Sequence, residues 1–172
     1  MEIIAEIGQN HNGNIELALE LINEAKANGA DVAKFQLYDA KALFPKKNNE
    51  WFKYNCKTEL SREQLSILAD ECKKIDIEFM ASVFDVKRVS WTEGIGVRRY
   101  KTASRSINDK NLLREIVDTG KPIIVSLGMW NQKVFPIIEG AKEVDFLYCI
   151  SKYPAALEDV NLSMVDFEQY SG

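Results

Sequence analysis

The chain has 172 residues, of which 46% are apolar and 28% charged, and its net charge is −4. This composition excludes disordered, collagenous and fibrous classes, and the acidic balance argues against nucleic acid as the main partner. No apolar run approaches the roughly 20 residues that a membrane helix needs, and the amino end does not resemble a secretory signal. We therefore expect a cytoplasmic protein of one domain with no membrane partner.

Short apolar runs alternate with amphipathic runs along the chain. Strands are predicted at 3–7, 31–38, 78–84, 97–102, 122–127 and 144–150. One helix is predicted between Asn14 and Gly29, a second behind the capping box Ser61–Gln64, and a short third between the strand at 78–84 and about Glu93. A fourth is predicted from a cap at Asn108 or Asp109 to Gly120, and two more over 134–141 and 162–170. A long polar and aromatic connection is expected over 39–59, where a lid and an interface are both open interpretations.

Strict alternation of strands and helices predicts a parallel sheet with helices outside. The candidates are an open doubly wound sheet and a (β/α)₈ TIM barrel. No Gly-x-Gly-x-x-Gly motif follows the first strand, which weakens the dinucleotide-binding version of the open sheet. Polar residues at the strand ends favour the barrel, because catalytic groups of barrels lie there.

The predicted carboxyl ends of the strands carry charged and hydroxyl side chains. They are Glu6, Lys34, Gln36, Ser82, Lys101, Ser104, Ser126, Ser151 and Tyr153. Lys34 and Gln36 share one face of an otherwise apolar strand, which is costly unless something binds them. Two lysines with hydroxyls nearby predict a phosphate or carboxylate pocket. The alternatives are that each lysine snorkels at the surface and that Glu6 forms a structural ion pair with Lys34.

Sulfur and imidazole groups are sparse. The three cysteines, Cys56, Cys72 and Cys149, fit neither a disulfide framework nor a zinc pattern, and we interpret them as reduced packing residues. The single histidine, His11, cannot supply the imidazole cluster typical of a transition-metal site. A turn or packing role and a functional role both remain open for His11.

Five ordered segments resemble the sialic acid synthases, a family of phosphoenolpyruvate-condensing barrel enzymes. They are 5–13 (AEIGQNHNG), 27–36 (ANGADVAKFQ), 100–104 (YKTAS), 120–129 (GKPIIVSLGM), and 149–154 (CISKYP) with 158–162 (EDVNL). The resemblance implies condensation of phosphoenolpyruvate with an N-acetylmannosamine-type aldehyde and release of phosphate. It also implies a divalent metal, Mn or Mg, no organic cofactor, and a homodimer.

The resemblance assigns roles by position. Lys34, Lys101 and Ser104 would hold the phosphate and carboxylate of phosphoenolpyruvate, with Ser151 as a further contact where the family often has Asn. Glu6 and Gln36 would line the pocket near the reacting carbons as the catalytic pair. Tyr153 would touch the sugar.

Two departures from the family pattern affect the expected function. Arg105-Ser106 stands where many members have Gly-Glu, so Ser106 marks a sugar-binding position and indicates a modified nonulosonate precursor. The family's metal-ligating histidines would lie beyond Gly172, as would an antifreeze-like domain. Residues 1–172 are therefore interpreted as about six units of an incomplete barrel, which should be inactive alone.

Two other functions remain open. A Schiff-base aldolase could use Lys101 or Lys152, which requires a lysine whose pKa is lowered in an apolar pocket. A non-catalytic fragment that binds phosphoanions is the other alternative.

Overall fold

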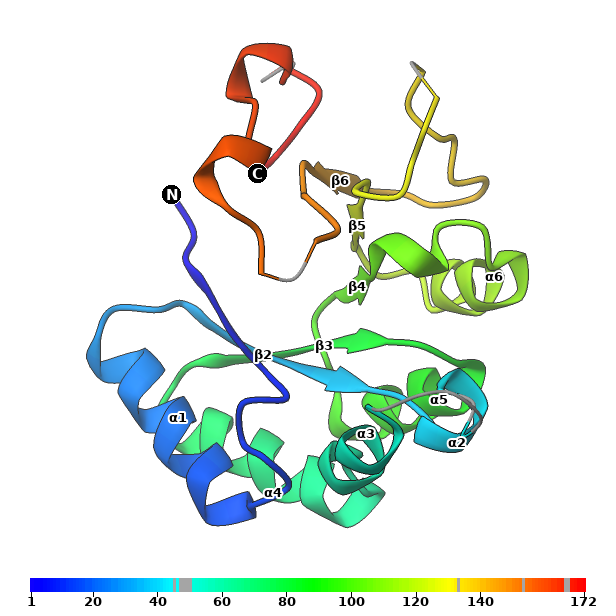
Figure 1. Ribbon diagram of the computed structural model, residues 1–172. Coiled ribbons are helices and arrows are strands. Elements are labelled where there is room, and N and C mark those ends of the chain that lie inside the picture. The colour runs from blue at the N-terminus through cyan, green and yellow to red at the C-terminus, as the bar shows by residue number, and fades with distance from the viewer. Residues whose placement is uncertain (45, 47–50, 133, 153, 166–167) are drawn as a thin grey trace. The chain divides into compact units, whose positions relative to one another are not determined.

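The computed structural model describes residues 1–44, 46, 51–132, 134–152, 154–165 and 168–172. The chain divides into two compact units, Met1–Val97 and Arg98–Gly172, and both are built from strands and helices (Figure 1). Among the described residues, no helix is long and apolar enough to cross a membrane.

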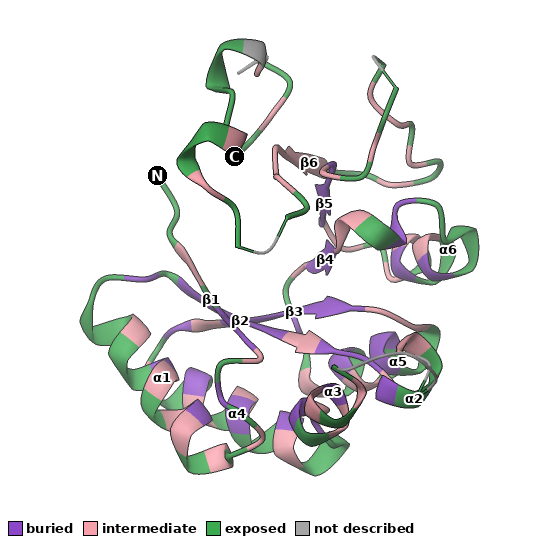
Figure 2. Cartoon of the chain, viewed as in Figure 1, coloured by how far each residue is buried: buried purple, intermediate pink, exposed green. Residues whose placement is uncertain are grey.

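Three parallel strands and five helices are present in the described part of the first unit. In chain order they are β1 (Ile4–Gly8), α1 (Ile15–Ala27), β2 (Val32–Leu37), α2 (Ala40–Leu43), α3 (Phe52–Thr58), α4 (Arg62–Lys74), β3 (Glu78–Val83) and α5 (Val86–Ile95). Strand β2 lies between β1 and β3 and pairs with both in parallel. Buried residues follow β2 and β3 and the faces of the helices that pack on them (Figure 2). This burial on both sides explains why β2 reads as a nearly continuous apolar run.

Local signals in the sequence set the ends of the helices. The Asn14 side chain accepts a hydrogen bond from the backbone N–H of Leu17 and begins α1. Ser61 and Gln64 form the predicted capping box at the start of α4. Gly29 adopts a φ of +86° just after α1, a conformation that glycine accepts without a steric penalty. These predictions are confirmed.

The second unit has three further strands. Its elements are β4 (Tyr100–Thr102), a 3₁₀ turn η1 (Ser104–Ser106), α6 (Lys110–Asp118), β5 (Ile123–Ser126), β6 (Val144–Leu147), and the 3₁₀ turns η2 (Leu157–Asp159) and η3 (Leu162–Met164). Strand β5 pairs in parallel with β4 and β6. The Asp109 side chain caps α6 by accepting from the N–H of Leu112, which decides between the two predicted caps. The far edge of β6 is paired too, since Ser171 N–H donates to the carbonyl of Phe146.

Three predicted segments differ in the structure. Residues 134–141 contain a turn but no helix, so the helix predicted there was wrong. In the described part of 162–170 only η3 forms, and the Asn161 side chain caps its start by accepting from the N–H of Ser163. The long connection expected over 39–59 contains two helices in its described part, α2 and α3, which were not predicted.

Candidate functional site

In the first unit, Glu6, Lys34 and Gln36 lie together at the carboxyl ends of β1 and β2. The register sets Glu6 beside Lys34, and their side chains form an ion pair. Gly8 has a φ of +54°, and a Cβ there would lie 3.0 Å from Glu6 Oε1 and 3.4 Å from Gln36 Nε2. Gln36 in turn faces Ser82 of β3 in the register. The absent side chain of Gly8 therefore leaves the space that these polar groups share.

Lys34 does not snorkel at the surface. Its side chain is only 11% exposed, whereas that of Glu6 is 48% exposed. Burial of an ammonium group is costly without a partner, and the Glu6 carboxylate supplies one. The structural ion pair considered from the sequence is present, and it also places one cation and one carboxylate at a strand end.

A second polar network, formed by Gln9, Tyr38, Asn55 and Thr58, fastens α3 to the ends of β1 and β2. Gln9 Nε2 lies 2.9 Å from Asn55 Oδ1 and 3.0 Å from Thr58 Oγ1. The Tyr38 hydroxyl donates to the backbone carbonyl of Asn55 at 3.1 Å, and Tyr54 donates to the carbonyl of Gln9. Sequence reasoning missed this network, because its members are spread over about 50 residues with no motif. It fixes the loop that follows the Glu6 strand.

His11 is buried in the loop between β1 and α1. Its Nδ1 accepts a hydrogen bond from the N–H of Gly13 at 3.1 Å, and within the described part of the chain its Nε2 has no hydrogen-bond partner. Burial lowers the pKa of His11, because desolvation disfavours the charged imidazolium. A Cβ at Gly13 would lie 2.2 Å from the carbonyl oxygen of Lys57, so the loop packs tightly on α3. These contacts give His11 a packing role in the loop.

We expect His11 to make the first unit less stable in mild acid. The folded pKa lies below the ordinary value of 6.5, so its contribution is present above that value and is lost as pH falls through the folded pKa. Protonation would also turn the Nδ1 acceptor into a donor facing the Gly13 N–H. Denaturant unfolding of wild type and His11→Gln should show a gap in unfolding free energy that narrows between about pH 7.5 and pH 5. A gap independent of pH would contradict this assignment.

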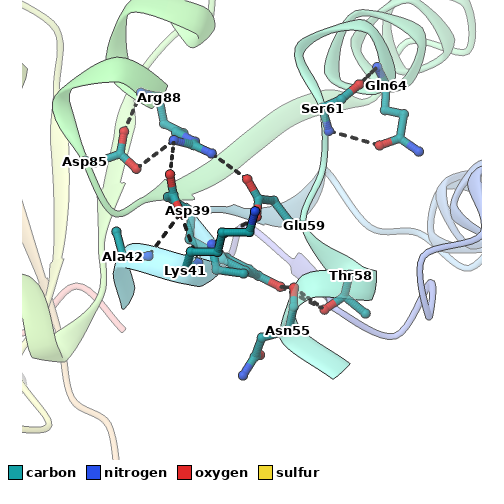
Figure 3. A network of polar contacts seen from close by, with 12 residues as sticks. Asp39, Lys41, Ala42, Asn55, Thr58, Glu59, Ser61, Gln64, Asp85 and Arg88 are labelled. Carbon is teal, nitrogen blue, oxygen red and sulfur yellow. Dashed lines mark hydrogen bonds and ion pairs between the residues drawn. The ribbon is translucent and has the colours of Figure 1, made fainter. Parts of the chain in front are cut away.

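Arg88 is the centre of an ion network at the outer side of the first unit. Its guanidinium lies 2.8 Å from Glu59, 3.3 Å from Asp85 and 3.9 Å from Asp39 (Figure 3). The Arg88 side chain is 4% exposed, while each carboxylate is 30–43% exposed. Beside it is an open depression of about 320 Å³, where the guanidinium also stacks on the ring of Trp91. The network joins the segments that follow β2 and β3 to the start of α4.

In the second unit, Lys101 is the buried cation at the end of β4. Its Nζ donates to the carbonyl oxygen of Thr102 at 2.8 Å and to the Ser126 hydroxyl of β5. Burial lowers the pKa of Lys101 to about 8, because few charged groups compensate the lost solvation. The ammonium is thus poorly neutralised by the protein and suited to bind an anion. By contrast, Lys152 is exposed and pairs with Asp159 at 2.7 Å.

Ser104 and Ser151 lie close to Gly128, just beyond β5. The N–H of Gly128 donates to Ser104 Oγ at 3.1 Å, and Cys149 Sγ lies 3.5 Å from the same oxygen. A Cβ at Gly128 would lie only 2.5 Å from Ser151 Oγ. Ser106 is buried in η1. Tyr153, the predicted sugar contact, lies outside the described residues.

The structure therefore brings together two subsets of the predicted site residues. Glu6, Lys34 and Gln36 meet in the first unit, and Lys101, Ser104 and Ser151 lie at strand ends of the second. The expectation that Lys34 and Lys101 converge on one pocket stays a prediction. Ser126, Gly128 and Cys149 were given no individual role in the site, although Ser126 stood at a predicted strand end and Cys149 was expected to be a packing residue.

The ligands of the expected divalent metal were predicted to lie outside this chain, so the described residues do not test that expectation. Within 1–44, 46, 51–132, 134–152, 154–165 and 168–172, no three His, Cys, Asp or Glu side chains gather as a metal site. The side chains of these residues do not by themselves fit such an ion. No catalytic step is therefore assigned to a metal held by them.

The parallel strands, covering helices and polar strand ends define an α/β protein of the (β/α)₈ barrel class, of which this chain provides six strands. The chain belongs to the NeuB family, whose model matches residues 21–169. The resemblance to the sialic acid synthases is thereby confirmed.

Individual relatives agree with this assignment. The chain is 38% identical over 95% of its length to uncharacterized protein MJ1065 of Methanocaldococcus jannaschii, of which it covers 50%. It is 35% identical over 93% of its length to N,N'-diacetyllegionaminic acid synthase of Legionella pneumophila, of which it covers 51%. The crystal structure of N-acetylneuraminic acid (sialic acid) synthetase from Leptospira borgpetersenii, in complex with citrate, superposes with a TM-score of 0.84 at 32% identity, covering 94% of this chain and 58% of the other. The chain spans about half the length of the curated relatives it matches.

Proposed function

We propose that this chain is part of a phosphoenolpyruvate-dependent nonulosonate synthase, which condenses phosphoenolpyruvate with an N-acetylmannosamine-type aldose. The observation that carries the proposal is the buried Lys101 ammonium, which donates to the Thr102 carbonyl oxygen and the Ser126 hydroxyl and has no carboxylate among the contacts described for it. Membership of the NeuB family and similarity to a diacetyllegionaminic acid synthase support the reaction class.

The residues fit the charge of the substrates. Phosphoenolpyruvate carries a phosphate and a carboxylate, and Lys34 and Lys101 would neutralise them while Ser104, Ser126 and Ser151 donate hydrogen bonds. A fixed anion presents its methylene carbon to the aldehyde carbon, where the new carbon–carbon bond forms. Water then adds to the second carbon of the enolpyruvyl group, and phosphate leaves. Glu6 and Gln36 are proposed to line the pocket around these carbons.

We infer that the sugar is a modified nonulosonate precursor. Arg105-Ser106 replaces the Gly-Glu pair of many sialic acid synthases, and Ser106 is too short to reach as a glutamate would. Tyr153 keeps its proposed sugar contact. The cytoplasmic location and the homodimer remain predictions for the whole protein.

The test is phosphate release by the complete protein with Mn²⁺ or Mg²⁺, phosphoenolpyruvate and a panel of N-acetylated and N,N'-diacetylated aldoses. Release that depends on one aldose, with a mass matching the condensed product, is expected. No release with any aldose, or release without one, would overturn the proposal. Residues 1–172 alone should show no turnover.

The Schiff-base aldolase remains a second candidate, because Lys101 is buried and burial lowers its pKa to about 8. A partly neutral amine at that pH can attack a carbonyl. Borohydride treatment with pyruvate should then add a stable mass to Lys101, and Lys101→Arg should prevent the addition. The proposed synthase predicts no such adduct.

Binding of phosphoenolpyruvate should weaken in mild alkali. The Lys101 ammonium loses its proton through a pKa of about 8, so the charged form that binds the anion falls steeply above that pH. Between about pH 7.5 and pH 9 the KM for phosphoenolpyruvate should rise about five- to tenfold. Lys101→Arg keeps its charge over this range and should give a flat profile, even if its KM is higher throughout. Identical profiles for the two proteins would assign the titration to another group.

A further inference from the structure

Gly128 lies at a point of unusually close packing in the second unit. A Cβ built at this glycine would lie 2.5 Å from Ser151 Oγ, 2.7 Å from the carbonyl oxygen of Cys149 and 3.0 Å from Ser104 Oγ. Its φ is not positive, so its backbone conformation does not call for glycine. The requirement for glycine here comes from space that a hydroxyl and a backbone carbonyl already occupy.

We propose that Gly128 is a positioning residue for the phosphoenolpyruvate site, acting through the Ser104 hydroxyl. This inference rests on the proposed function and names a residue that determines how tightly the anion binds. The close approach places the N–H of Gly128 3.1 Å from Ser104 Oγ, so that the serine oxygen accepts a hydrogen bond from the backbone.

That hydrogen bond determines the direction in which Ser104 can donate. A serine hydroxyl has one proton and two lone pairs. The Gly128 N–H occupies one lone pair. The Cys149 thiol donates to the Leu147 carbonyl oxygen, and its sulfur, 3.5 Å from Ser104 Oγ, is only a weak acceptor for the serine proton. The hydroxyl proton is then left for an acceptor outside this cluster. An anion held by the Lys101 ammonium of the same unit is such an acceptor.

An alanine at position 128 would disturb this arrangement selectively. The Ser151 side chain can rotate away from a new methyl group, because it is exposed. The Cys149 carbonyl belongs to the backbone and cannot, so the segment carrying Gly128 must shift. A shift of several tenths of an ångström lengthens the bond to Ser104 and frees its hydroxyl to rotate.

The experiment uses the complete protein, with phosphoenolpyruvate as the varied substrate. Gly128→Ala should raise the KM for phosphoenolpyruvate about tenfold, with kcat and the KM for the aldose changed less than about threefold. Ser104→Ala should produce a similar rise. In the double variant the two effects should not multiply, because both act on one hydroxyl. Gly94→Ala is the matched control, since its Cβ would meet only an arginine nitrogen at 3.7 Å.

Each outcome decides a different point. If wild type does not use phosphoenolpyruvate, the proposed function fails. If wild type uses it and Gly128→Ala leaves its KM unchanged, or the two effects multiply fully, the positioning role is overturned. If Gly128→Ala does not fold, Ser104→Ala still tests the positioning role of Gly128, which acts through the Ser104 hydroxyl. An unchanged KM for phosphoenolpyruvate in Ser104→Ala would contradict that role.

Discussion

Lys101→Ala is expected to lower kcat/KM for phosphoenolpyruvate tenfold to several-hundredfold in the complete enzyme. A charge-assisted hydrogen bond is worth about 1.5–3 kcal/mol, which corresponds to roughly ten- to 160-fold, and the loss of the cation beside a partly buried dianion moves the cost toward the upper end or beyond. Lys101 is 5% exposed, so water cannot readily replace its ammonium. The loss should fall on phosphoenolpyruvate rather than on the aldose, which steady-state kinetics with each substrate varied will separate.

Two variants make this result specific. Lys101→Arg keeps the charge but not the shape, and it should restore activity only in part. Lys110→Ala removes an exposed lysine at the start of α6 in the same unit and should leave both kinetic constants unchanged. Unaltered phosphoenolpyruvate kinetics in Lys101→Ala would remove the anion-binding role from the second unit.

Arg88→Ala should destabilise the first unit by about 3 kcal/mol. Removing one partner of a buried ion pair typically costs about 3–5 kcal/mol, because the remaining charges lose their compensation. The three carboxylates around Arg88 are each about a third exposed and can recruit water, which places the cost at the lower end. Chemical denaturation followed by circular dichroism measures the change in unfolding free energy.

The matched control is Lys74→Ala, which breaks an ion pair of similar length with Glu71 at the surface of α4. Its lysine side chain is 72% exposed, so almost no change in unfolding free energy is expected. Arg88→Lys should recover only part of the lost stability, because an ammonium lacks the planar set of donors with which the guanidinium contacts Glu59 and Asp85 together. Equal changes in unfolding free energy for Arg88→Ala and Lys74→Ala would show that the buried Arg88 network stabilises the protein no more than an exposed ion pair does.

The sequence was most informative where a single local rule acts. The alternation of short apolar runs with amphipathic runs predicted the six strands found in the described residues, and the capping residues Asn14 and Ser61 predicted where two helices begin. The helix expected over 134–141 was wrong, since an apolar stripe at helical spacing does not by itself establish a helix. Helix α3 was missed because no side chain caps it and distant groups such as Gln9 hold it in place.

Some residues of the candidate site could be predicted from the sequence and others could not. Charged and hydroxyl residues at strand ends are visible in the sequence because β/α units repeat, which is how Lys34, Lys101 and Ser104 became candidates. The role of Gly128 is not visible, because it depends on a carbonyl 21 residues away that approaches to 2.7 Å of the missing Cβ. The buried Arg88 network is hidden for the same reason, since its three carboxylates come from separate segments.

The Glu6–Lys34 ion pair sets a threshold for anions. Glu6 is tethered beside Lys34, so it competes with free anions as an intramolecular partner at high effective concentration. A small monovalent anion that approaches Lys34 must displace a carboxylate of equal charge, and it gains little by doing so. A ligand with a doubly charged group overcomes this competition more readily. The resting protein therefore carries its own competitor, which keeps abundant simple anions from occupying this lysine.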